Sequence, residues 1–432
     1  MAPELSLTDK HSNKGTGGAT AAVQAAPLRA PIPFFRPDIG DEERAEVDKV
    51  LRSGWITSGP TTERFQRDFA TAVCAPFAIA VNSCTAALHL AVEALGLRSG
   101  EAVLVPTMTF AATAEIVRYQ GAIPVLVDCD PETCNIDIED AERKIQAVKS
   151  GKLPGVPAEA TVRGIIPVHV GGLMCDMARL KQFARDHRLW IVEDAAHAFP
   201  AAWRGAASKP WRRCGERTAD VTCFSFYANK TITTGEGGMA VCSDEAIAQR
   251  MKLMCLHGLS HDAWGRYSGK GPWDYRIVAP GFKYNMADPL AAIGVHQVAK
   301  AERLRVRREA LAAFYSDEMR DLEAVETPPI NSDRIHAWHL YPIRLRLDCL
   351  RISRNEVITA LKEAGIGCSV HWRPLHLHPY YRETFDWSPV DCPVASEVWE
   401  RLISLPLFPS LSLEDAAAVV ETLRSICRDY AR

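Results

Sequence analysis

Short apolar runs that alternate with helical patterns constrain the fold of this chain more than any other feature. Strands that are apolar on both faces and separated by helices predict a mostly parallel sheet that helices cover. The last run follows a glycine turn, and we expect it to be antiparallel to its neighbours. The runs cover residues 78–81, 102–105, 123–127, 164–168, 189–192, 221–226 and 239–241.

Length and composition place the chain among ordinary globular proteins. Its 432 residues suffice for one large domain and a smaller one. The formal net charge of −3 gives no reason to expect a nucleic acid or an anionic membrane surface as partner. Residues 1–30 are rich in Ala, Gly, Ser and Thr and lack the apolar core of a secretory signal, and no later run is long enough to span a bilayer. We expect 1–30 to be a disordered tail, 31–300 a large α/β domain and 301–432 a small α+β domain.

The second half of the chain has its own pattern of elements. A helical stretch over 286–322 joins the two domains, with a break expected near Lys300. Alternation predicts a strand over 338–347, and 368–372 is a further strand candidate. Ser353 with Glu356 three residues later predicts a capping box for a helix over 353–364. Ser412 is the expected N-cap of a terminal helix that runs to about 427.

Cysteine and histidine do not form a recognisable metal motif. The chain has 13 cysteines, an odd number, without a CxxC pair. We interpret them as reduced thiols of a cytoplasmic enzyme. His371, His376 and His378 form the densest histidine group, but no acidic or cysteine partner stands at ligand spacing. We therefore expect no metal, and a role in a substrate pocket is the better interpretation of His371.

One lysine follows a buried strand directly. The run 221–226 leads through Ser225 to Lys230 and then into a turn with Gly235, Gly237 and Gly238. Burial of an ammonium is costly, and the same burial lowers the pKa of a lysine and makes its amine a nucleophile toward an aldehyde. A surface lysine on a loop is the commoner case, so this stretch by itself decides nothing.

A second stretch favours a functional lysine over a surface lysine at position 230. The run 189–192 ends in Glu193 and Asp194, and His197 follows three residues later. Carboxyl ends of strands are where open α/β sheets bind ligands. A lysine and such an aspartate on neighbouring strands are what pyridoxal phosphate requires, because the lysine forms the Schiff base and the aspartate keeps the pyridine nitrogen protonated.

The words around these residues resemble the sugar aminotransferase family called DegT/DnrJ/EryC1/StrS. The resemblance covers nearly everything from about Pro33 onward, and the HGLSHDAWGRY word is most similar to the branch that aminates C4 of UDP-linked keto-sugars. The words that carry it are EDAAHA, FSFYANKTITTGEGGM, SGWITSGP, NSCTAALHLA, PTMTFAATA, HGLSHDAWGRY, GFKYNMADPLAAIG and HPYY.

The resemblance implies roles for particular residues. Lys230 is the Schiff-base lysine, Asp194 the partner of the pyridinium, and His197 a contact of the ring or its phenolic oxygen in place of the glutamine of many relatives. Phe110 stacks on the pyridine face. The implied phosphate contacts are Ser225, Thr85, Ala86 and, from the partner subunit, Asn285. Thr57 and His371 are candidate substrate contacts.

The implied fold is that of aspartate aminotransferase, and the implied assembly is a homodimer with shared active sites. The implied reaction is a two-half transamination, with glutamate as amino donor and a nucleotide-linked keto-sugar as acceptor, in amino-sugar or polysaccharide biosynthesis. Two alternatives stay open. A dehydratase of the same fold replaces the lysine with histidine, whereas Lys230 is present here. A non-catalytic regulatory relative has no need of Asp194, Ser225 and Lys230 together.

Overall fold

The computed structural model of this chain describes residues 30–259 and 276–432. The predicted disorder of the N-terminal tail and the expectations for the HGLSHDAWGRY word from residue 260 onward lie outside these ranges.

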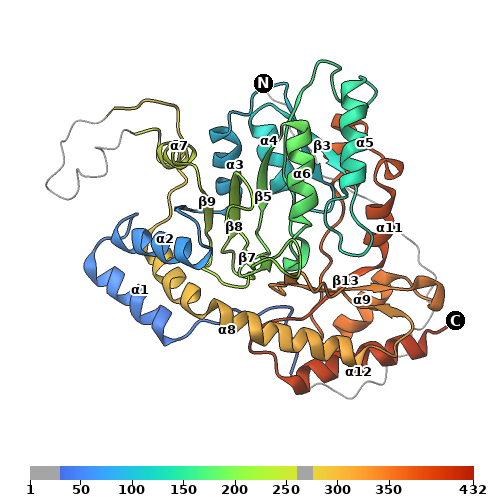
Figure 1. The fold of residues 1–432 in the computed structure, drawn as a ribbon. Helices are drawn as coiled ribbons and strands as arrows, with labels where there is room; N and C mark the ends of the chain where they lie inside the picture. Colours follow the sequence, from blue (N-terminus) through green and yellow to red (C-terminus); the bar gives the residue numbers. More distant parts are fainter. Residues whose placement is uncertain (1–29, 260–275) are drawn as a thin grey trace, which may run out of the picture.

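A seven-stranded sheet forms the centre of the large domain (Figure 1). Five of its strands are parallel neighbours, as the apolar runs predict, and β9 pairs antiparallel with both β1 and β8, which confirms the expectation for the run after the glycine turn. The strands in spatial order are β1 (Phe77–Val81), β9 (Gly238–Cys242), β8 (Val221–Ser225), β5 (Trp190–Asp194), β4 (Val162–Ile165), β2 (Ala102–Pro106) and β3 (Ile123–Val127).

Helices cover both faces of this sheet. Figure 1 shows α3 (Cys84–Ala94) and α4 (Ala112–Tyr119) on one side and α5 (Ile138–Lys149) and α6 (Met177–His187) on the other. Three of the helices begin with an aspartate whose carboxylate accepts from backbone amides of the first turn, namely Asp137 of α5, Asp176 of α6 and Asp244 of α7 (Glu245–Cys255). Helices α1 (Asp41–Ser53) and α2 (Pro60–Ala72) pack against α8.

Helix α8 (Asp288–Glu318) joins the two domains as one helix of 31 residues. The predicted break near Lys300 is wrong. The Lys300 ammonium lies 2.6 Å from a carboxylate oxygen of Asp38 and 2.7 Å from one of Glu43, so this charge is paired without any interruption of the helix. Leu304 belongs to the core of the large domain and Leu311 to that of the small one, so the packing changes within α8, just beyond the predicted boundary at 300.

The small domain packs helices on a three-stranded antiparallel sheet of β10 (Val325–Glu326), β12 (Tyr341–Leu345) and β13 (Leu402–Leu405). The capping box of Ser353 on α9 (Arg354–Glu363) and the Ser412 cap of α12 (Leu413–Asp429) are confirmed. Segment 368–372 is not a strand. It makes a single bridge, between Ser369 and Ser404, because residues beyond it turn back toward the large domain.

The shorter elements complete the fold. Ile32 pairs with Ile366 and packs in the core of the small domain, so the first described residues do not belong to the large domain as the expected range 31–300 implies. The remaining helices are α10 (Pro379–Phe385) and α11 (Pro393–Arg401), and β6 (Ala202–Trp203), β7 (Arg212–Arg213) and β11 (Arg334–Ile335) form a small third sheet. Among residues 30–259 and 276–432, no helix combines the length and the apolarity that a membrane span requires.

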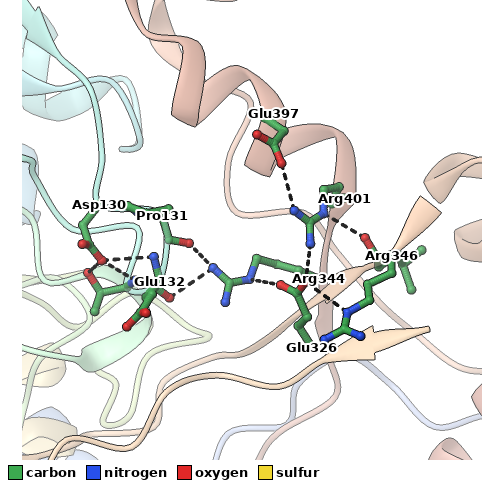
Figure 2. Close-up of polar contacts among 10 residues, drawn as sticks. Asp130, Pro131, Glu132, Glu326, Arg344, Arg346, Glu397 and Arg401 are labelled. Atoms are coloured by element: carbon green, nitrogen blue, oxygen red, sulfur yellow. Dashed lines mark hydrogen bonds and ion pairs between the residues drawn. The ribbon is translucent and has the colours of Figure 1, made fainter. Parts of the chain in front are cut away.

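Arg344 ties the two domains together (Figure 2). Its guanidinium donates to the backbone carbonyls of Pro131 and Glu132 in the large domain and lies 3.3 Å from the carboxylate of Glu326 in the small one. The guanidinium of Arg401 also donates to the carboxylate of Glu326, at 2.7 Å. The ion-pair cluster thus holds the 130–132 loop against β12.

Candidate active site

A cavity of about 600 Å³ opens at the carboxyl ends of β5 and β8, where the large domain meets segment 370–372. It brings together most of the residues that the sequence predicts for the site. The predicted residues that line it are Lys230, Asp194, His197, Ser225, Thr85, Phe110 and His371.

Lys230 reaches this cavity from the turn after β8. Removal of the amine from water lowers its pKa to about 8, although the charge of Asp194 acts in the opposite direction. At this pKa about a fifth of the amine is neutral at pH 7.4, far more than for an ordinary lysine, and the neutral form is the one that attacks an aldehyde or accepts a proton.

Asp194, the last residue of β5, carries the facing carboxylate. Thr113 donates to its Oδ2 at 2.7 Å and the amide of Ala196 to its Oδ1 at 3.1 Å. Thr109 and Thr113 share a further hydrogen bond of 2.7 Å between their hydroxyls. Burial raises the pKa of Asp194, and the hydrogen bond from Thr113 acts against that rise. These hydrogen bonds fix the orientation of the Asp194 carboxylate, which can then pair with a cationic group of a ligand.

Glu193 points to the opposite side of β5, since neighbouring residues of a strand alternate. The hydroxyls of Thr218 and Thr222 donate to its Oε2, and the imidazole of His169 lies 3.3 Å from its Oε1. Burial by itself raises the pKa of Glu193, but these hydrogen bonds outweigh it and lower the pKa. Glu193 is thus a buried, fully partnered carboxylate outside the cavity.

His169 also belongs to the group of side chains with metal-ligand spacing in the described residues, with Glu193 and Cys214. The amide of Cys175 lies 3.1 Å from Nδ1 of His169, and Nε2 of the ring lies 3.3 Å from Glu193. Burial by itself lowers the pKa of His169, but the interactions with Cys214, Cys175 and Glu193 outweigh it and raise the pKa well above the usual range. Both ring nitrogens are thus engaged within the protein. The histidines of the 371–378 cluster are engaged elsewhere, with Ser404 on His371 and with Thr107 and Ser396 on His376.

The turn between β1 and α3 forms an anion cradle. Ser83 is the N-cap of α3, and its hydroxyl accepts from the amide of Ala86, so that amide is already engaged and Ala86 does not line the cavity. A Cβ on Gly238 would lie 2.5 Å from the backbone of Ser83, so only glycine permits β9 to approach this turn. Thr85 and Ser225 complete the lining here, and the helix dipole of α3 favours an anion.

His197 lies on the floor of the cavity. The amide of Gly171 approaches its Nδ1 at 3.3 Å, which leaves the proton on Nε2. Burial and the charge of Lys230 hold its pKa well below the usual range, so the ring is neutral. Trp372 stacks on it with ring centroids 4.9 Å apart. His197 therefore presents an N–H donor in a fixed orientation.

Besides Ala86, two predicted residues, Asn285 and Thr57, do not line this chain's cavity. Asn285 donates to the hydroxyl of Ser58 at 2.7 Å, and Thr57 accepts from the amide of Asp288 at 3.2 Å. Both lie together where the 55–59 loop meets the start of α8. The roles of Asn285 and Thr57 stay predictions.

The structure adds residues that the sequence motifs did not single out. Cys84, Thr109, Asn229 and Trp372 line the cavity, and Thr113 reaches it through Asp194. Asn229 has a buried Oδ1 without a hydrogen-bond partner among the described residues. Helical spacing does not identify this pair, because Thr109 lies before α4, which begins at Ala112, and the bond between the two hydroxyls depends on the turn that precedes the helix.

The donor set fits a planar, phosphate-bearing pyridine aldehyde. The cavity has a neutralisable amine, a carboxylate for a ring nitrogen, an anion cradle, an N–H donor, and in Phe110 an aromatic side chain that is 64% exposed beside it. Such a group requires each of these features, and their arrangement around one cavity supports acid–base chemistry at a substrate carbon.

Curated proteins resemble this chain over nearly its whole length. The chain is 46% identical over 395 residues to the uncharacterised protein MJ1066 of Methanocaldococcus jannaschii, covering 91% of this chain and 97% of that protein. It is 40% identical over 398 residues to the spore coat polysaccharide biosynthesis protein SpsC of Bacillus subtilis, covering 92% and 97%.

Solved structures give the same result. The putative sugar aminotransferase Spr1654 of Streptococcus pneumoniae, known in PLP and PMP forms, superposes with a TM-score of 0.81 at 30% identity, over 92% of this chain and 98–99% of that one. The model of the DegT/DnrJ/EryC1/StrS aminotransferase family matches residues 37–424. The chain therefore belongs to the DegT/DnrJ/EryC1/StrS aminotransferase family.

Proposed function

We propose that this aminotransferase uses pyridoxal 5'-phosphate to transfer an amino group from glutamate to a nucleotide-linked keto-sugar, with a UDP-linked 4-keto-sugar as the favoured acceptor. The observation that carries the proposal is the pairing, in one cavity, of the Lys230 amine, whose pKa is lowered to about 8, with the buried carboxylate of Asp194.

Each residue has a defined task in this proposal. When bound, the cofactor supplies the electron sink that makes a proton on the neighbouring carbon acidic. Asp194 would hold the ring nitrogen in its protonated form. The neutral amine of Lys230 would accept and return a proton at the reacting carbon, and the Nε2–H of His197 would serve as a donor toward the phenolic oxygen. Ser225, Thr85 and the start of α3 would hold the phosphate, and Phe110 would cover the ring face.

The substrate class is supported by the relatives. SpsC is named for polysaccharide biosynthesis and Spr1654 as a putative sugar aminotransferase. We extend these descriptions to this chain because the matches span more than nine-tenths of it. The nucleotide, the 4-keto position and the glutamate donor are parts of the proposal, as are the cytoplasmic location and a homodimer in which Asn285 reaches the partner's phosphate site.

Two successive measurements test the proposal. Purified protein reconstituted with pyridoxal phosphate should absorb in the visible, and glutamate should bleach this band as the amino form of the cofactor accumulates. UDP-, GDP- and dTDP-linked keto-sugars are then added, and the sugar that restores the band is identified. Lys230→Ala should show no visible band, whereas the exposed Lys209→Ala serves as the matched control. A normal band and turnover in Lys230→Ala would exclude the assignment.

A further inference from the structure

His376 is the completely buried member of the 371–378 histidine cluster, and it has no part in the proposed transfer. Its imidazole bonds two hydroxyl groups, because Nδ1 lies 2.7 Å from Oγ1 of Thr107 and Nε2 lies 2.8 Å from Oγ of Ser396. Burial lowers the pKa of His376 to about 4, so the ring is neutral near pH 7. One ring nitrogen therefore donates a hydrogen bond and the other accepts one.

The surrounding donors and acceptors determine which nitrogen of His376 carries the proton. The hydroxyl of Ser396 donates its single hydrogen to the carbonyl of Cys392 at 3.1 Å, so its oxygen accepts from Nε2–H of the ring. The backbone amide of His376 donates to Oγ1 of Thr107 at 3.3 Å, which leaves the Thr107 hydroxyl to donate to Nδ1. Thr107 is completely buried as well, so water does not compete for these bonds.

Thr107 stands directly before one part of the active-site lining. It follows β2, and its carbonyl accepts from the amide of Thr109 at 3.1 Å and from the amide of Leu375 at 2.9 Å. Thr109 and Phe110 line the cavity. Displacement of Thr107 therefore displaces this part of the lining with it.

His376 stands directly after another part of the same lining. Trp372 precedes it by four residues, lines the cavity and stacks on His197 with ring centroids 4.9 Å apart. The hydrogen bond between Thr107 and His376 joins positions 269 residues apart in the sequence. It thus connects the segment that carries Phe110 with the segment that carries Trp372.

The Ser396 side of the His376 ring is attached to the large domain by a separate route. Ser396 belongs to α11, and the carboxylate of Asp128 accepts from the amides of Val394 and Ala395 in the first turn of that helix, at 2.9 and 2.8 Å. Helix α11 therefore keeps its place on the large domain without the bond to His376. The two sides of the ring can be tested independently.

We propose that Thr107 and His376 are positioning residues of the cofactor site, whose hydrogen bond fixes the separation of the Phe110 and Trp372 segments. Neither residue lines the cavity, so both act through the aromatic side chains that do. This inference rests on the proposed function, because it takes the cavity at Lys230 as the place where pyridoxal phosphate binds.

Thr107→Val tests the inference in the full-length protein with two measurements besides turnover. Valine keeps the shape of the side chain and removes the hydroxyl, so pyridoxal phosphate should bind about tenfold more weakly. The visible cofactor band should lose circular dichroism, because the walls of the cavity no longer have a fixed separation. Amides of residues 371–378 should exchange with deuterium about tenfold faster, in the loaded and the cofactor-free protein alike. Thr107→Ser keeps the hydroxyl and should restore all three properties.

Variants at His376 and Ser396 assign the effect to one side of the ring. His376→Asn places a carbonyl oxygen where Nδ1 stands and should retain the bond to Thr107, whereas His376→Gln reaches only the Nε2 position and should behave like Thr107→Val. Ser396→Ala is the matched control. It should lower the melting temperature about as much as Thr107→Val but leave cofactor affinity within about twofold of the wild type. If both variants weaken the cofactor equally, His376 has only a general structural role and the inference is wrong.

The two proposals fail in different ways. If Lys230→Ala loses the visible band while Thr107→Val keeps wild-type cofactor affinity and deuterium exchange, the cofactor site stands and the positioning role is wrong. If Lys230→Ala keeps the band, the assignment of this cavity to the cofactor is wrong, irrespective of how Thr107→Val behaves.

Discussion

Replacement of Thr113 by valine tests how the Asp194 carboxylate is held. Valine keeps the shape of the side chain and removes the hydroxyl that donates to Asp194 at 2.7 Å and bonds Thr109. Thr113 is completely buried and Asp194 is 5% exposed, so water does not replace the lost donor. Loss of a hydrogen bond to a buried charged group costs about 1.5–3 kcal/mol.

The size of this loss is measurable as a change in melting temperature of the cofactor-free protein. In domains somewhat smaller than the large domain here, the melting temperature falls by about 2–4 °C for each kcal/mol of lost stability. The expected decrease for Thr113→Val is therefore about 3–12 °C. Thr113→Ser retains the hydroxyl and should recover most of the difference. Thr109→Val leaves the bond to Asp194 intact and should cost less than Thr113→Val.

The pH dependence gives the sharper check. Burial raises the pKa of Asp194, so its ionised form costs the folded protein free energy, and the Thr113 hydroxyl offsets part of that cost. The gap in melting temperature between wild type and Thr113→Val should therefore be largest well above the pKa of Asp194 and shrink as the pH falls through it. A gap below 1 °C at pH 8, or one that does not change with pH, would refute this account of the carboxylate.

Three further outcomes are expected at the proposed cofactor site. The pKa of Lys230 is lowered to about 8, and only its neutral amine reacts with an aldehyde. Uptake of pyridoxal phosphate by the cofactor-free protein should therefore accelerate as the pH rises from 6 and level off above about 8. A rate that stays constant with pH in stopped-flow absorbance measurements contradicts this. Asp194→Asn should preserve the fold and lower kcat by more than tenfold, or about 1.4 kcal/mol; a smaller loss means that another group holds the ring nitrogen. Refolding Lys230→Ala together with Asn285→Ala should restore part of the activity, since mixed dimers with shared sites contain one intact site; mixed dimers without recovery exclude sharing.

Asp194 and Lys230 could be predicted because each follows an apolar strand directly in the sequence. An apolar strand that ends in a carboxylate and another that leads to a lysine identify Asp194 and Lys230, and the parallel pairing of β5 with β8 then places them at one edge of the sheet. The same reasoning gave the order of elements and the caps at Ser353 and Ser412.

Other features depend on contacts between distant parts of the chain, and no local pattern reports these. Trp372 stacks on His197 across the domain boundary, and Arg118 contacts Tyr380 from 262 residues away. The continuity of α8 at Lys300 was missed for the same reason, since its paired carboxylates come from Asp38 and Glu43. The sequence around Lys300 does not indicate that its ion-pair partners are more than 250 residues away.

The alternation of Glu193 and Asp194 along β5 has a consequence for the alignment of that strand. Two adjacent carboxylates are nearly equivalent chemically, so a slip of β5 by one residue would present the longer acid to the cavity in place of the shorter one. The donors His169, Thr218 and Thr222 oppose that slip, because it would strip Glu193 of all three. The hydrogen bonds on the face away from the cavity thus act as a register lock, and they determine which of two acids serves the chemistry on the other face.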